Sequence, residues 1–252
     1  MKNKKYLTLP IALLVVIVVC QLIILGVSKD DASTEAPELE EQSQIVEEAI
    51  PEKLTTTDTK DIVALQADNA DIYAWITIPG TTLDYPVLQS EDDNFYLDHK
   101  ADGSEGLPGA VYTNKIDGKD FSKSNTVIYG HNMKDGSYFG QLHLFEDEGF
   151  FTENKEIYVY LEDKKLTYEI IAASKFNDSY LPEKYLMDSA VGVKQFFSDL
   201  SGYASEDSTC HFTEDFAEVE DGQYITLSTC IKGENDQRYV VVGRLVTVEF
   251  YE

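Results

Sequence analysis

Short runs of alternating residue character constrain the fold of this chain more than any other feature. They are rich in β-branched and aromatic residues and end in turn-forming residues, which is typical of strands. In order they read TLDYPVLQ, GAVYTN, NTVIYG, EIYVYLE, KLTYEIIAAS, YITLSTC and RYVVVGRLVTVEF. Many short strands separated by turns predict a β-barrel or a β-sandwich. We therefore expect a mainly β domain.

One late segment has the period of a helix instead. Residues 189–204 carry apolar side chains on a single stripe, at Val193, Phe196, Phe197 and Leu200. Such spacing predicts an amphipathic helix with one face against the core. The helix would be inserted between two of the late strands.

The composition changes near residue 60. All aromatic residues except Tyr6 lie at or after Tyr73, and residues 28–59 are acidic and contain no aromatic residue. A segment of that composition cannot bury a core of its own, so we interpret it as an extracellular spacer. Residues 60–252 suit one domain with a sizeable core. Ile62, Leu65 and Ile72 predict a helix that leads into this domain and ends near YAWITIPG.

The first 27 residues predict a membrane anchor. Lys2, Lys4 and Lys5 precede an uncharged run from Leu7 to Val27. A helix of about 20 apolar residues spans a bilayer, and basic flanks stay in the cytoplasm. We therefore expect a cytoplasmic tail at 1–6, a transmembrane signal anchor at 7–27 and an extracellular remainder. A cleaved signal peptide is the alternative, but its apolar part is normally shorter and ends in a small-residue cleavage site.

The charge of the chain argues against a nucleic-acid partner. It has 46 acidic and 20 basic residues, a formal net charge of −26, and every acidic residue lies at or after Asp30. A surface of this sign repels phosphates. Solubility is the simplest interpretation of the excess of acid.

Cys230, at the end of YITLSTC, has three interpretations: a nucleophile, half of a disulfide with Cys210, or a buried thiol. Cys20 lies in the anchor, so at most one disulfide can form outside the membrane. Strand alternation places Cys230 on the face of Thr226 and Ser228, which is unusually polar. A structural thiol is more typical of an apolar face.

Arg238 re-enters a strand after IKGENDQ, a turn-rich loop of seven residues. If the two strands form a hairpin, Arg238 stands roughly opposite Cys230. A guanidinium stays protonated, so it can hold an oxyanion or favour a thiolate but cannot act as a base. The alternative is an ordinary solvated arginine on a strand.

A cysteine nucleophile needs a proton donor or base nearby. His131 follows NTVIYG just past a strand end, a typical place for a catalytic residue. His99 lies in a polar stretch, His143 lies among apolar neighbours and is expected to be packed, and His211 follows Cys210.

Other chemistries find little support in the spacing of residues. The sequence has no C-x-x-C, H-x-x-x-H, H-E-x-x-H or G-x-S-x-G motif. Adjacent strand residues such as Cys210 and His211 also point to opposite faces. We therefore expect no metal site, no cofactor and no serine nucleophile.

The motifs resemble those of the sortase family. TLSTC ending at Cys230, with Arg238 on the next strand, resembles the signature T-L-x-T-C…R, and NTVIYGHN around His131 resembles the histidine block. The resemblance covers about residues 60–252. It implies an eight-stranded β-barrel and an N-terminal membrane anchor in a Gram-positive bacterium. The helix between the sixth and seventh strands, with helical residues before Trp75, is most similar to class B; class D and pilin-building class C remain open.

The resemblance also implies a mechanism and partners. Cys230 would attack a threonine carbonyl in a sorting motif of a secreted protein and form a thioester, Arg238 would steady the oxyanion, and His131 would handle the protons. The acceptor would be an amine of peptidoglycan or of a pilin, and class B motifs are of the N-P-x-T-x kind. Ser228, Asn94 in EDDNFYLDH and Tyr129 are the substrate-contact candidates, with Tyr129 equally readable as a barrel-wall aromatic. A thiol hydrolase and a non-catalytic wall-binding module are the alternatives.

Overall fold

The computed structural model describes residues 54–203, 207–216 and 222–252. The predicted tail, the predicted anchor and the spacer up to residue 53 lie outside these ranges. Within them, no helix combines the length and apolar composition needed to cross a membrane.

Strands dominate the described part of the chain. They are β1 Thr55–Thr56, β2 Ile72–Thr77, β3 Asp84–Leu88, β4 Val111–Thr113, β5 Asn125–Tyr129, β6 Glu156–Tyr160, β7 Lys164–Asn177, β8 His211–Phe212, β9 Tyr224–Ile231 and β10 Glu234–Tyr251. The α-helices are α2 Ile62–Gln66, α3 Phe95–Asp98, α4 Glu148–Glu153, α5 Leu181–Lys184 and α6 Ala190–Tyr203, and the 3₁₀ helices are η1 Lys115–Asp117 and η2 Phe139–Glu146. The mainly β prediction is confirmed.

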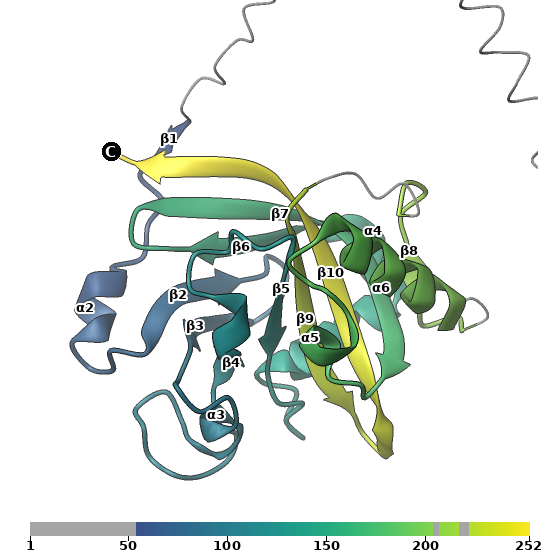
Figure 1. Cartoon of the computed structure of the whole chain (residues 1–252), viewed down its shortest axis with the longest axis horizontal. Helices are drawn as coiled ribbons and strands as arrows, with labels where there is room; N and C mark the ends of the chain where they lie inside the picture. The colour runs from purple at the N-terminus through teal and green to yellow at the C-terminus, as the bar shows by residue number, and fades with distance from the viewer. Residues whose placement is uncertain (1–53, 204–206, 217–221) are drawn as a thin grey trace, which may run out of the picture. The chain divides into compact units, whose positions relative to one another are not determined.

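Eight of the strands close into a barrel (Figure 1). Their order is β10, β9, β5, β4, β3, β2, β6 and β7, and the ring closes because β10 pairs with both β9 and β7. The short strands β1 and β8 pair with β10 and β7, beyond the ends of the β9 and β6 ladders. Closure leaves no free edge around the ring, which confirms the expected eight-stranded barrel.

The barrel interior is one apolar core to which all eight ring strands contribute. Ile128, Tyr168, Leu227 and Val241 are among its fully buried members. Neighbouring residues such as Val240 point the other way, as alternation requires. There they meet a second layer, so β9 and β10 are buried on both faces.

Helix α6 forms that second layer and lies against β7, β9 and β10 (Figure 1). The four residues of its predicted stripe are all buried there: Val193, Phe196, Phe197 and Leu200. The helix precedes β9, which is the seventh strand of the barrel, so its predicted position between the sixth and seventh strands is also confirmed.

The leading helix is shorter than predicted. Helix α2 ends at Gln66, and Ile72–Thr77 is strand β2 rather than the end of a helix. The side chain of Asp61 accepts a hydrogen bond from the Ala64 N–H and caps the start of α2. Tertiary pairing decides the rest, because β2 lies between β3 and β6 and both ladders need its backbone extended.

Candidate active site

Cys230 and Arg238 are brought together by the β9–β10 hairpin. They are directly paired residues of the antiparallel ladder, as the sequence predicted. The connection is tighter than the predicted seven-residue loop, because Ile231 pairs with Glu234 around a turn at Lys232 and Gly233. The backbone of Gly233 has φ +84°, which glycine adopts without strain.

A bulge on β10 sets the direction of the Arg238 side chain. The register shifts between the Glu234 and Arg238 pairs, so the three residues between them have no partner on β9. Carbonyls of this bulge hold the guanidinium, since Arg238 Nη1 donates to the oxygens of Asn235 at 3.1 Å and Gln237 at 2.9 Å. Bulges of this kind re-aim a side chain next to a functional site.

The face of β9 that carries Cys230 is polar but not open to solvent. Thr226 and Ser228 are buried, and only Cys230 at the strand end is exposed. Burial of Thr226 is tolerated because its hydroxyl and the amide of Asn125 form two hydrogen bonds, at 2.9 and 3.1 Å. The thiol is therefore the accessible end of an otherwise buried row.

His131 reaches the site from β5, which runs parallel to β9. The ladder between these strands ends with the pair Tyr129 and Ser228. Past this end, the Gly130 N–H donates to the Ser228 carbonyl at 3.2 Å, and the Thr229 hydroxyl donates to the Gly130 carbonyl at 2.7 Å. These bonds keep the two chain segments together up to the residue before His131.

Glycine is required at position 130 because the chain passes close to an aromatic ring. A Cβ atom there would lie 2.6 Å from the Phe139 ring. The His131 ring is oriented from the opposite side, with Nε2 2.7 Å from the carbonyl oxygen of Leu97. A carbonyl only accepts, so Nε2 carries the proton in this contact.

The three predicted catalytic residues line one cleft of about 220 Å³. Ser228 and Tyr129 line it as well, so five of the six predicted site residues meet there. The sequence analysis did not identify the other lining residues, which are Leu97, Tyr112, Gly130, Asp178, Ser179, Tyr180 and Thr229. Most of them come from loops and from α3, whose approach to β9 has no local sequence signal.

Asn94 is not among the residues that line the cleft. It is exposed at the start of α3, where its N–H donates to Asp92 Oδ1 at 2.9 Å. Its expected contact with substrate stays a prediction.

Tyrosines form the apolar wall of the cleft. Tyr112 and Tyr129 stack with ring centroids 5.5 Å apart. Burial raises the pKa of both hydroxyls well above the ordinary tyrosine range, so both stay neutral. Among the described residues, the Tyr129 hydroxyl has no hydrogen-bond partner, and its oxygen is buried.

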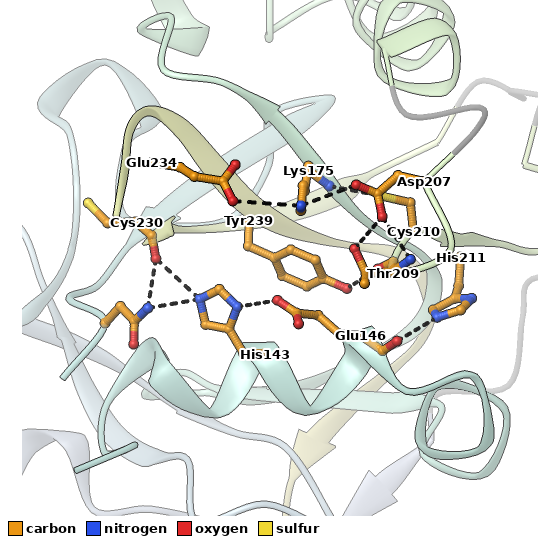
Figure 2. Close-up of polar contacts among 11 residues, drawn as sticks. His143, Glu146, Lys175, Asp207, Thr209, Cys210, His211, Cys230, Glu234 and Tyr239 are labelled. Atoms are coloured by element: carbon orange, nitrogen blue, oxygen red, sulfur yellow. Dashed lines mark hydrogen bonds and ion pairs between the residues drawn. The ribbon is translucent and has the colours of Figure 1, made fainter. Parts of the chain in front are cut away.

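Cys210 does not share the site with Cys230. Both thiols are free, which rules out the disulfide interpretation in this structure. The sulfur of Cys210 accepts a hydrogen bond from the Lys175 N–H at 3.2 Å instead. Figure 2 shows the two cysteines on opposite sides of Tyr239.

The sequence analysis missed a second histidine beside Cys230. His143 was expected to be packed among apolar neighbours, but it is only partly buried, and its Nδ1 lies 2.6 Å from Glu146 Oε1. In Figure 2 its ring faces the carbonyl oxygen of Cys230. The H-x-x-E spacing on a helix was the one sequence signal for this pair, since residues three apart on a helix are neighbours.

Comparison with known proteins places this site in a family. Residues 76–246, more than half of the chain, match the sortase domain family. Sortase B of Listeria monocytogenes is 31% identical over 185 residues, which cover 73% of this chain and 73% of that protein.

Solved structures agree with the sequence comparison. The X-ray structure of Clostridium perfringens sortase B matches with a TM-score of 0.64 and 27% identity, covering 73% of this chain and 99% of that one. A Streptococcus pyogenes class B sortase involved in pilus biogenesis matches with a TM-score of 0.61 and 25% identity, covering 73% and 97%. The barrel and its inserted helix are thus those of known class B enzymes.

Proposed function

The chain belongs to the sortase family of cysteine transpeptidases and is most like class B, and we propose that it joins secreted proteins to the cell wall. It cleaves a sorting motif of the N-P-x-T-x kind and transfers the acyl group to an amine of peptidoglycan. The observation that carries this proposal is the cleft in which Cys230 is paired with Arg238 and His131 lies beside them.

The first half of the reaction is acyl transfer to sulfur. Cys230 gives its Sγ proton to His131 and attacks the threonine carbonyl carbon, and a C–S bond forms as the carbonyl oxygen takes up negative charge. Arg238 stabilises this oxyanion through its permanent charge. His131 gives a proton to the leaving nitrogen, the C–N bond breaks, and a thioester remains.

The second half returns the enzyme to its starting state. An incoming amine gives a proton to His131 and attacks the thioester carbon. The new C–N bond forms as the C–S bond breaks, and His131 passes the proton to Sγ, which regenerates the thiol. A thioester keeps the reactivity of the acyl group, so an amine can capture it in place of water.

Substrate contacts are assigned to the cleft wall. Ser228 is buried next to Cys230 in this wall, and the ring of Tyr129 contributes to the same wall. Asn94 is retained as a third contact on the basis of the resemblance of EDDNFYLDH to class B sequences.

We place the enzyme in the cell membrane with its catalytic domain outside. The uncharged run 7–27 behind three lysines supports a single-pass anchor, and the acidic composition of 28–59 supports a spacer. Assembly of pilin subunits is the second candidate function, favoured by the similarity to the S. pyogenes enzyme involved in pilus biogenesis.

Product analysis tests the proposal directly. The full-length chain, in detergent, is incubated with fluorogenic N-P-x-T-x peptides and with shuffled peptides, with and without an added amine. We expect cleavage of the motif only, and a mass shift from acid to amide product when amine is present. Acid product alone at every amine concentration would indicate a thiol hydrolase. Transfer to a pilin lysine but not to a peptidoglycan fragment would support pilus assembly.

A further inference from the structure

A polar network lies against the main chain of Cys230, on the side away from its sulfur. Figure 2 shows the carbonyl oxygen of Cys230 directed at His143, while the sulfur points away. Asn132 Nδ2 lies 2.9 Å from that oxygen and 2.9 Å from His143 Nε2. His143 Nδ1 lies 2.6 Å from Glu146 Oε1.

One tautomer of His143 accounts for the three shortest contacts in this network, and the fourth, 3.2 Å between His143 Nε2 and the Cys230 oxygen, is then a contact between two acceptors. The amide nitrogen of Asn132 carries two N–H groups, and these donate to the Cys230 oxygen and to His143 Nε2. Nε2 therefore accepts, so the ring proton is on Nδ1 and is donated to the Glu146 carboxylate. Every polar group in the chain from Glu146 to Cys230 is then satisfied.

The network touches the chain at or next to each of the three catalytic residues. Asn132 directly follows His131, and it holds the carbonyl of Cys230 itself. The His143 ring packs on Tyr239, the neighbour of Arg238, with centroids 5.1 Å apart. The last main-chain hydrogen bond between the segments bearing Cys230 and His131 runs from the Gly130 N–H to the Ser228 oxygen. Beyond it, these segments are joined by the side chains of Thr229 and Asn132.

Two residues of the network, His143 and Glu146, lie on a helix that is packed into the barrel core. Helix η2, which carries His143 and Glu146, buries Phe139, Leu142 and Phe145 completely in the barrel core. Its last carbonyl, that of Glu146, accepts a hydrogen bond from His211 Nε2 at 3.0 Å (Figure 2). A residue held in this way can fix the position of the groups that it contacts.

We propose that His143 is a positioning residue of the transpeptidase site. Held by Glu146 and acting through Asn132, it keeps Cys230 and the segment after His131 at the separation that acyl transfer requires. His143 itself bonds to Asn132 and Glu146, so its effect on the reaction is indirect. The inference rests on the proposed function, because the reaction is its readout.

Single and double substitutions in the full-length chain test the network. We expect Asn132→Ala and His143→Ala each to lower kcat on the order of 10²-fold, as small misplacements of reacting groups do. KM for the sorting peptide should stay unchanged, because Asn132, His143 and Glu146 do not line the cleft. Glu146→Gln keeps an acceptor for the Nδ1 proton and should restore most of the kcat that Glu146→Ala loses. The Asn132→Ala/His143→Ala double variant should be no slower than either single variant, since both break one chain of contacts.

Two further variants separate positioning from folding. Asp147→Ala removes the cap that accepts the Phe150 N–H at 2.8 Å, one residue from Glu146. It should lower the Tm but leave kcat unchanged. Gly140→Ala leaves His143 intact but places a Cβ 3.1 Å from Asn132 Oδ1, so it should lower kcat even if His143→Ala does not fold.

The outcomes are distinct from those for the proposed function. If the parent cleaves peptide and Cys230→Ala does not, the function stands whatever the network variants do. Kcat values of His143→Ala and Gly140→Ala within a few-fold of the parent would overturn the positioning role. So would losses that multiply in the double variant, or a loss in Asp147→Ala as large as that in His143→Ala.

Discussion

Cys230 and Arg238 face each other as directly paired residues of the antiparallel β9–β10 ladder. Side chains at such positions have Cβ atoms about 4.5–5.5 Å apart. The thiol is exposed, and the guanidinium is anchored to the carbonyls of its own bulge. A permanent cation is thereby held on the residue that is directly paired with the thiol-bearing residue.

Replacement of Cys230 by alanine should abolish turnover without loss of stability. No other described thiol lies in the cleft, so cleavage of the sorting peptide should fall by on the order of 10³-fold or more. The side chain is exposed, and removal of an exposed side chain typically changes the free energy of unfolding by less than about 0.5 kcal/mol. Peptide cleavage and thermal unfolding are measured together. Residual cleavage near the parental rate would assign the nucleophile elsewhere.

Arg238→Lys should be almost as inactive as Arg238→Ala. A lysine keeps the charge but lacks the planar fork that bonds to the carbonyls of Asn235 and Gln237, so its position is not held. We expect kcat/KM to fall by about 10²–10³-fold in both. Arg244→Ala is the control on the same strand. Arg244 is paired with Asp215 and Glu169, so its loss should cost stability and leave kcat/KM intact. Activity retained in Arg238→Lys would mean that charge alone suffices.

His131→Ala should remove the proton donor for the leaving amine. A positioned acid or base typically contributes 10²–10⁴-fold, and we expect a loss of about that size in kcat. His99→Ala serves as the matched control, because His99 is bonded to Asp98 at 2.7 Å and stacked on Phe95 rather than placed in the cleft. Equal losses in the two variants would undo the assignment of His131.

The thiols of Cys210 and Cys230 should behave independently. Cys230 is exposed and Cys210 is half-buried with its sulfur bonded to the Lys175 N–H, so native alkylation should label Cys230 first. Cys210→Ser should retain full activity. Peptide mapping under non-reducing conditions gives the check, and a stoichiometric Cys210–Cys230 disulfide in active enzyme would contradict the mechanism.

Asp117 should make stability depend on pH. It is buried, its Oδ1 accepts the Val127 N–H at 3.2 Å, and burial raises the pKa of its carboxyl to about 7. In the unfolded chain the pKa is about 3.9. Between these values the folded state keeps a proton that the unfolded state has released, so the free energy of unfolding falls as pH rises toward 7.

Asp117→Asn should remove this dependence. Relative to the parent, the variant should gain on the order of a few kcal/mol in free energy of unfolding between pH 4 and pH 8, as urea titrations at each pH would show. Asp120→Asn is the control, because bonds from Ser122 hold the pKa of the exposed Asp120 carboxyl below its usual value. Above pH 5, the free energy of unfolding of Asp120→Asn should change with pH in the same way as that of the parent. If the free energy of unfolding of Asp117→Asn changes with pH in the same way as that of the parent, Asp117 is ionised in the folded state.

Much of the barrel was predictable because strands and helices have local periods. The seven predicted strand runs correspond to β3, β4, β5, β6, β7, β9 and β10, and the α6 stripe was placed residue by residue. Strand β2 was mistaken for a helix end, since its extended backbone is imposed by two neighbouring strands. The polarity of one face of β9 was readable from the sequence, but its burial was not, because α6 and the Asn125 amide cover it.

The same difference between local and distant contacts decided how much of the candidate site could be predicted. Cys230 and Arg238 were paired from sequence because a hairpin joins neighbouring segments, and alternation decides which side chains share a face. The resemblance identified His131, but its position beside Cys230 depends on the parallel β5–β9 pairing between segments about a hundred residues apart. His143 had no such motif, and Asn132, through which it acts, bonds to the Cys230 carbonyl 98 residues away. Residue type and local period therefore determined the strands and the pairing of Cys230 with Arg238. Closure of the barrel decided which distant side chains surround this pair, because contacts between distant segments leave no periodic pattern in the sequence.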